Sequence, residues 1–149
     1  MNRLLLQTLV VDPNSRAGTI GHFFLRVAAG AMVFYIHGLH KLEGWIAYRQ
    51  HGTPWELLDE VSGMHFPAPY FSTVAATLIQ FIAPLFIIFG LFTRINAFLL
   101  VGALSGALLQ NLLAGRNPQL VLLYLIIATT LIFLGSGKIS LDAKLLKKI

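Results

Sequence analysis

The chain has 149 residues and a formal net charge of +5; 56% of its residues are hydrophobic and only 11% are charged. Soluble domains carry about 25% charged residues, so this composition, with a mean hydropathy of +0.75, excludes an ordinary soluble domain and indicates a membrane protein. The absence of cysteine excludes disulfides, thiolate catalysis, iron–sulfur clusters and cysteine-bound zinc within this chain. The basic residues mostly flank apolar stretches, which favours contact with lipid head groups over nucleic acid.

Four apolar stretches predict membrane-spanning helices at about residues 18–39, 71–92, 95–114 and 118–135. With a rise of about 1.5 Å per residue, such stretches cross a hydrocarbon core of about 30 Å. Together they use more than half of the chain. We therefore expect an all-α membrane protein with one four-helix bundle over residues 1–149 and no second domain.

The first two spans are joined by the longest predicted loop, residues 40–69. It is rich in tryptophan, tyrosine and proline, a composition typical of the head-group layer. Within it, Pro54–Val61 predicts a short surface helix with proline in its first turn. We expect this loop to cap the bundle on the outer side of the membrane.

Lysine and arginine are unequally divided between the two sides of the predicted bundle. Seven fall on the side that holds both termini and the turn between the second and third spans, and three on the opposite side. Because cytoplasmic loops carry an excess of these residues, both termini are predicted to be cytoplasmic.

Small residues and one proline predict how the helices pack. Gly102 and Gly106 are spaced for close helix packing in the third span, and Ala28–Ala31 gives the first span a similar narrow waist. Pro84 lies inside the second span, where it is expected to bend the helix and leave the backbone carbonyl of Gln80 without its donor.

The ionisable residues of the first span share one helical stripe. At 100° per residue, His22, Arg26, His37, His40 and Lys41 fall within about 100° of one another. An arginine within the membrane usually faces the bundle interior or a water-filled cavity. The alternative is that Arg26 lies shallow and extends to the cytoplasmic head groups.

The outer end of this stripe, at His37, His40 and Lys41, offers hydrogen-bond donors to the carbonyl oxygens of a head group or a small ring. Gln80, Gln110 and Asn111 are neutral polar residues that can line the same pocket or form interhelical hydrogen bonds. Neither a metal nor a haem site is expected, because no further ligand lies at helical spacing.

Several segments, taken together, resemble the DoxX family. They are Leu25–Gly30 followed by His37–Leu42, then Gly90–Arg94, and finally Leu134–Asp142. The resemblance implies four membrane helices in the cytoplasmic (inner) membrane of a bacterium or archaeon, and a relationship to the membrane subunit of thiosulfate:quinone oxidoreductase. Many relatives have a glutamate in the second helix where this chain has Gln80. If that glutamate carries a proton or pairs with the arginine of the first helix in relatives, this chain has lost a negative charge.

Three functions are consistent with these observations. In the first, the chain is a membrane subunit that binds a quinone-like ligand and works with a partner oxidoreductase; the candidate ligand-binding residues are Arg26, His37, His40, Lys41 and Gln80. In the second, it is a non-catalytic membrane anchor or assembly partner of a redox complex. A partner protein or a homo-oligomer is expected. In the third, the stripe binds or transports a small solute or an anion. The sequence leaves open whether the chain is itself an enzyme, and it identifies neither the electron donor nor the partner.

Overall fold

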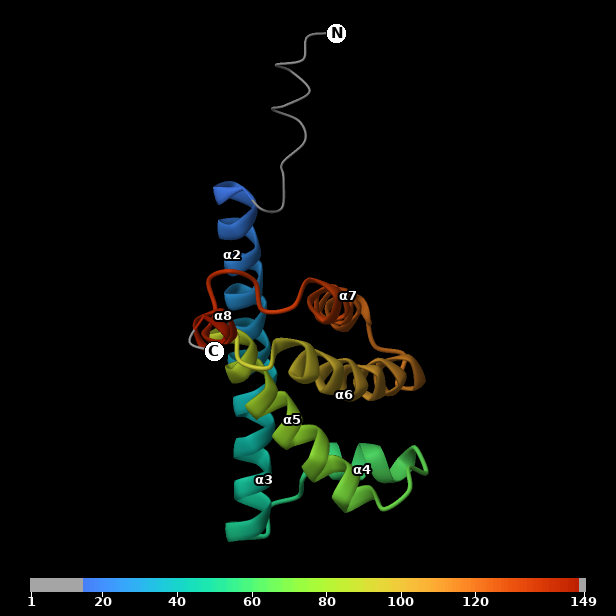
Figure 1. The fold of residues 1–149 in the computed structure, drawn as a ribbon. Coiled ribbons are helices and arrows are strands. Elements are labelled where there is room, and N and C mark those ends of the chain that lie inside the picture. The colour runs from blue at the N-terminus through green and yellow to red at the C-terminus, as the bar shows by residue number, and fades with distance from the viewer. Residues whose placement is uncertain (1–14, 148–149) are drawn as a thin grey trace, which may run out of the picture.

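The computed structural model describes residues 15–147, and this part of the chain is helical with no strand (Figure 1). Its elements, in order, are α2 (Arg16–Met32), η1 (Val33–Leu39), α3 (His40–His51), α4 (Glu56–Gly63), α5 (Pro69–Phe89), α6 (Thr93–Leu113), α7 (Gln119–Leu134) and α8 (Leu141–Leu146). The first three form one continuous helix of 36 residues, in which η1 has π-helical hydrogen bonding.

The long first helix corrects the predicted start of the outer loop. A loop was expected from His40, but the helix continues to His51 and ends at Gly52, whose φ of 66° is left-handed. At about 1.5 Å per residue it is about 54 Å long, more than a hydrocarbon core of about 30 Å requires. Part of it therefore extends beyond the core. The predicted surface helix is confirmed as α4, although its N-cap is Trp55, so that Pro54 lies before the first turn.

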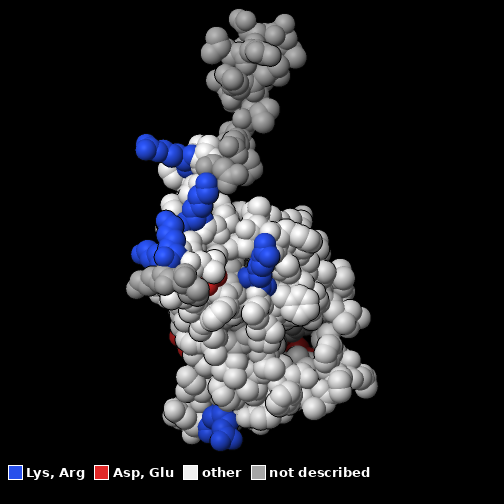
Figure 2. All heavy atoms as spheres, viewed as in Figure 1, with Lys and Arg blue, Asp and Glu red and all other residues white. Residues whose placement is uncertain are grey.

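Among residues 15–147, three helices are long and apolar enough to cross a membrane: Arg16–His51, α5 and α6. The fourth apolar helix, α7, has 16 residues and is shorter than a typical span. Large apolar side chains are exposed along the helices, among them Phe71 (74%) and Phe133 (77%), as expected for a surface in contact with lipid. A wide, largely uncharged surface, with only small acidic patches toward its edges, separates the basic side chains toward the two ends of the molecule (Figure 2). A multi-pass membrane fold is thus confirmed, whereas the fourth crossing and the cytoplasmic termini stay predictions.

The helices pack in a series in which α5 is central. It contacts α2 and η1 on one side and α6 on the other, and α6 pairs with α7. In Figure 1, α7 is seen nearly end-on, whereas the axis of α2 lies in the plane of the picture, so the two helix axes are steeply inclined to each other. The core that joins η1, α5, α6 and α7 consists of Val33, Ile87, Ala97, Leu100, Leu104, Val121, Tyr124, Ala128 and Leu131.

The closest approach between η1 and α5 lies at Gly38. A Cβ atom placed there would be 2.5 Å from the Gln80 carbonyl oxygen and 3.0 Å from the Phe81 Cα. Pro84 has no N–H to donate to that carbonyl, and α5 continues through the proline. The Gln80 carbonyl, which receives no hydrogen bond from residue 84, therefore lies against Gly38, where the absence of a side chain leaves room for it.

Gly102 and Gly106 behave differently from the sequence-based expectation. A Cβ at either glycine would meet no atom of residues 15–147 within 4 Å, apart from the helix's own backbone. The predicted close packing at these positions is therefore wrong within this chain. The first helix, by contrast, does approach α5 closely at Gly30, where a Cβ would lie 2.8 Å from Ile88 Cγ1.

Candidate functional site

The polar stripe of the first helix divides into two separate centres. Eleven residues separate Arg26 from His37, a distance of about 16 Å along the helix. A helical wheel drawn at 100° per residue also gives wrong directions for the side chains beyond η1. The π-helical hydrogen bonds of η1 connect residues five apart rather than four, so each residue turns the helix by less than 100°. The shared stripe seen in the sequence therefore does not become one shared site.

Arg26 forms the first centre, together with the segment that follows α7. Its guanidinium donates hydrogen bonds to the carbonyl oxygens of Ser136 and Ile139, the latter at 2.7 Å. The side chain is only 1% exposed, so it neither extends to head groups nor lines either of the cavities described below. Its contacts tie the C-terminal segment to α2, and a ligand-binding role for Arg26 stays a prediction.

Asp142, at the start of α8, ties the same segment to the turn between α5 and α6. Its carboxylate accepts a hydrogen bond from the Phe92 N–H at 3.1 Å, and its own N–H donates to the Gly90 carbonyl at 3.1 Å. A Cβ at Gly90 would collide with the Arg26 guanidinium. This glycine therefore leaves the space that the buried arginine occupies.

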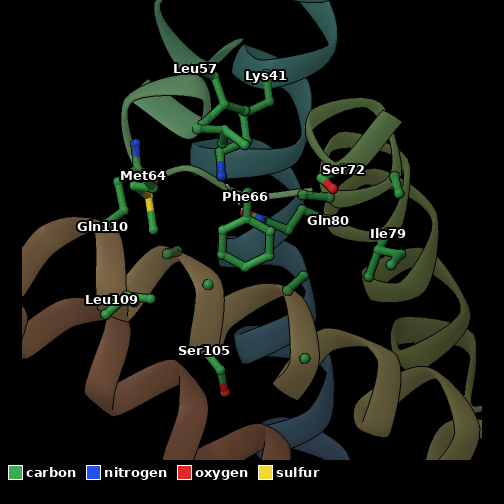
Figure 3. Close-up of a pocket in the computed structure, with 17 residues that line it drawn as sticks. Lys41, Leu57, Met64, Phe66, Ser72, Ile79, Gln80, Ser105, Leu109 and Gln110 are labelled. Carbon is green, nitrogen blue, oxygen red and sulfur yellow. Dashed lines mark hydrogen bonds between the residues drawn. The ribbon is translucent and has the colours of Figure 1, made fainter. Parts of the chain in front are cut away.

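Lys41 and Gln80 form the second centre. The Lys41 ammonium donates to Gln80 Oε1 at 3.0 Å, so the pairing of two predicted site residues joins the long helix to α5. Both side chains line a cavity of about 470 Å³ between α4, α5 and α6 (Figure 3). We call this the inner cavity; its volume lies within the range of about 300–1,000 Å³ that is usual for ligand pockets.

Most of the wall of the inner cavity is apolar. Phe66 lies over α6 and the Lys41 ammonium points inward in Figure 3. The hydroxyls of Ser72 and Ser105 donate to the backbone carbonyls of Pro67 and Val101, so neither hydroxyl proton is offered to the cavity. The remaining lining residues are Leu57, Val61, Met64, Ala75, Ala76, Ile79, Gly102, Ala103, Gly106, Ala107, Leu109 and Gln110.

The polar end of this cavity is rich in hydrogen-bond donors. An ammonium carries three donors and no acceptor, and Lys41 uses one of them on Gln80. The Gln80 side chain is only 2% exposed, and its amide nitrogen donates to no group within residues 15–147. The carbonyl oxygen of this amide is already occupied by Lys41. Together the two side chains suit a ligand that brings acceptor oxygens.

A second, more polar cavity of about 740 Å³ adjoins the first and shares Lys41, Leu57, Ala107 and Gln110 with it. We call it the vestibule. It is lined by His37 and His40 from the long helix, by Gln110 and Asn111 from α6, and by several charged residues of both signs. The structure therefore brings both predicted histidines and both neutral polar residues of α6 to one cavity next to Lys41.

An ion pair between Arg116 and Glu60 holds α4 against the loop that follows α6. Their side chains are 2.5 Å apart. The hydrogen bond and the negative charge of Glu60 raise the pKa of the Arg116 guanidinium. This pair lies in the vestibule wall, where it connects α4 with the loop between α6 and α7.

Sequence reasoning missed the residues that α4 and its following loop contribute, above all Phe66 and Met64. Because it treated residues 40–69 as one surface loop, it had no basis for placing them over the third span. It also assigned Gly102 and Gly106 to packing. The available signal was two glycines four residues apart in one helix. Such a pair can face either a neighbouring helix or a cavity, and the sequence does not show which of the two lies against it.

A family model named DoxX matches residues 21–116, which run from α2 through α6. The chain belongs to the DoxX family. The match includes every lining residue of the inner cavity, so the candidate site lies within the DoxX portion. It ends before α7, and the resemblance of Leu134–Asp142 stays a prediction. Neither the curated proteins nor the solved structures gave a match.

Proposed function

We propose that this DoxX protein binds a quinone-like ligand in the inner cavity, as the membrane subunit of a redox system. The observation that supports the proposal is the donor-rich end formed by Lys41 and Gln80 in an otherwise apolar cavity. A quinone has the complementary chemistry, because its carbonyl oxygens accept hydrogen bonds and its ring and tail are apolar. Ligand pockets characteristically combine apolar walls with a few placed polar groups.

In this arrangement the Lys41 ammonium and the Gln80 amide donate to a ring carbonyl, while Phe66 packs on the ring. His37 and His40 lie on the vestibule side, next to Lys41. The sequence offers no cysteine ligands for an iron–sulfur cluster. The proposal therefore includes a partner oxidoreductase, or a directly bound donor, as the source of electrons.

The charges in the vestibule give less support to an anion-binding function. Three glutamates, at positions 43, 56 and 60, line it together with Lys41 and Arg116. Arg26, the other candidate for holding an anion, already donates to two backbone carbonyls. A neutral ligand with acceptor oxygens fits both sets of contacts better.

The test is quinone binding by the protein purified in mild detergent, with Lys41→Met as the variant. The probe is a benzoquinone with a ten-carbon saturated tail, and the readout is quenching of tryptophan fluorescence, checked by equilibrium dialysis. Losing a hydrogen bond from a charged donor weakens binding by about ten- to a hundredfold.

The matched control is Arg49→Met, which removes an exposed positive charge from the same helix outside both cavities. It should bind the quinone as the wild type does. Extraction and mass spectrometry of the purified wild type should also recover a bound quinone. Absence of binding in the wild type, or equal binding by Lys41→Met, contradicts the proposal.

A further inference from the structure

Two pairs of helix glycines in this protein have opposite surroundings. Gly30 and Gly38 lie where a Cβ would collide with α5. Gly102 and Gly106, one turn apart on α6, lie where a Cβ would meet no atom of the described chain within 4 Å beyond their own helix. The first pair is required by packing inside the chain, whereas the second pair is not.

Glycine destabilises a helix interior relative to alanine, because it has more conformational freedom to lose on folding. Close packing compensates this cost at Gly30 and Gly38. At Gly102 and Gly106 no packing within the described chain offsets it. Both residues line the inner cavity, so whatever fills that cavity lies on the bare backbone of α6.

Gly106 is partly buried and Gly102 is exposed, and residues of α4 and of the segment after it line the same cavity. They are Leu57 and Val61 of α4 and, after it, Met64 and Phe66. In Figure 3 the Phe66 ring lies over α6. A flat ring needs less space between these residues and α6 than the helix of another copy would, which favours a ligand.

Gln80 supplies an independent sign of a ligand. Its nearly fully buried side chain lines the same cavity with an amide nitrogen that no acceptor of the described chain occupies. Buried polar groups are normally hydrogen-bonded. The same ligand that covers the glycines can therefore accept from this amide.

We propose that Gly102 and Gly106 form the surface on which the ligand ring lies, and that their missing side chains determine the size of ring admitted. The proposal rests on the proposed function. It assigns α6 a specificity role: a two-ring naphthoquinone covers more of the glycine surface than a one-ring benzoquinone. Side chains at these positions should therefore exclude the larger ring first.

The experiment compares Gly102→Ala, Gly106→Ala and Gly106→Leu with the wild type in mild detergent. The probes are a benzoquinone and a naphthoquinone that carry the same ten-carbon tail. Overpacking of one methyl group should weaken naphthoquinone binding by about tenfold, with a smaller loss for benzoquinone. Gly106→Leu should abolish binding of both. Thermal stability without ligand should stay equal or rise in the alanine variants, because alanine favours the helix.

Gly21→Ala is the matched control. Gly21 also has open space beyond its Cα, but it lies in α2 outside the inner cavity, so this variant should gain stability and keep wild-type binding. If the wild type binds quinone and the α6 variants bind it equally well, the ring-surface inference is wrong and the proposed function stands. If the wild type binds neither quinone, both the ring-surface inference and the proposed function are wrong. Loss of stability, or dissociation of a wild-type dimer, in the α6 variants would instead assign the glycines to packing.

Discussion

The contact between Gly38 and α5 leads to a quantitative prediction for Gly38→Ala. The added Cβ would be 2.5 Å from the Gln80 carbonyl oxygen and 3.0 Å from the Phe81 Cα, both of them backbone atoms. Ordinary contacts between heavy atoms are about 3.5 Å or more, so the two helices must separate by about 1 Å. Overpacking of this kind costs about 1–3 kcal/mol, and because both contacts are with backbone atoms that cannot rotate away, we expect the upper part of that range, about 2–3 kcal/mol. The better helix propensity of alanine offsets about 1 kcal/mol.

We therefore expect Gly38→Ala to lower the free energy of unfolding by about 1–2 kcal/mol. For a chain of this length, that corresponds to a fall of about 2–8 °C in the midpoint of thermal unfolding. Circular dichroism in a fixed detergent measures this midpoint. The control Gly21→Ala, whose added Cβ meets no atom within 4 Å, should not lower the midpoint. A Gly38→Ala protein as stable as the wild type would refute the close contact between η1 and α5.

Two further predictions concern the connections made by arginine side chains. Arg26→Met removes the hydrogen bonds to Ser136 and Ile139, and at about 0.6–1.5 kcal/mol for each bond we expect a loss of about 1–3 kcal/mol. Hydrogen–deuterium exchange should quicken at residues 136–142; unchanged exchange there would contradict the tie. Breaking the Glu60–Arg116 pair with Arg116→Gln should lower the unfolding midpoint only slightly, because the pair is exposed. Glu60 raises the pKa of Arg116 in the folded protein. The pair therefore contributes fully to the free energy of unfolding at every pH below the pKa that Arg116 has in the unfolded chain. That contribution is lost only as the pH rises through the higher pKa of the folded protein. The difference between variant and wild type should therefore be constant from about pH 6 to about pH 10 and shrink in about 1 M salt; a change with pH in this range would refute it.

A control for the Arg26 prediction lies in the same region of the fold. Arg94 donates one hydrogen bond, at 3.3 Å, to the Phe133 carbonyl, and its side chain is exposed. Arg94→Met removes the same charge but only this one contact. Its effect on exchange at residues 136–142 should be much smaller than that of Arg26→Met.

The helical membrane fold was predictable because apolar stretches long enough to cross a bilayer depend only on local composition. The end of the first helix was not. The helix continues beyond Lys41 to His51, whereas a span predicted from hydropathy stops where charges begin. The prediction therefore placed residues 40–51 in a loop, although they continue the helix that holds Lys41.

The candidate site was predictable in part. The pairing of Lys41 with Gln80 joins two residues that the sequence had selected separately. Arg26 was grouped with Lys41 because a helical wheel records direction around an axis but not distance along it. The role of Gly102 depends on which atoms of other helices lie opposite. Only the packing of α4 and α5 against α6 supplies that information.

The two backbone carbonyls that accept hydrogen bonds from Arg26 affect the order in which the helices reach their final packing during synthesis. Ser136 follows Arg26 by 110 positions in the chain, so a ribosome completes the first helix long before it produces the acceptors. Until then the guanidinium must keep water or a lipid phosphate as its partner, because burying an unpaired charge in the membrane is costly. The helix Arg16–His51 can therefore reach its final position only after the segment beyond α7 has been synthesised, so its packing belongs to the last steps of biogenesis.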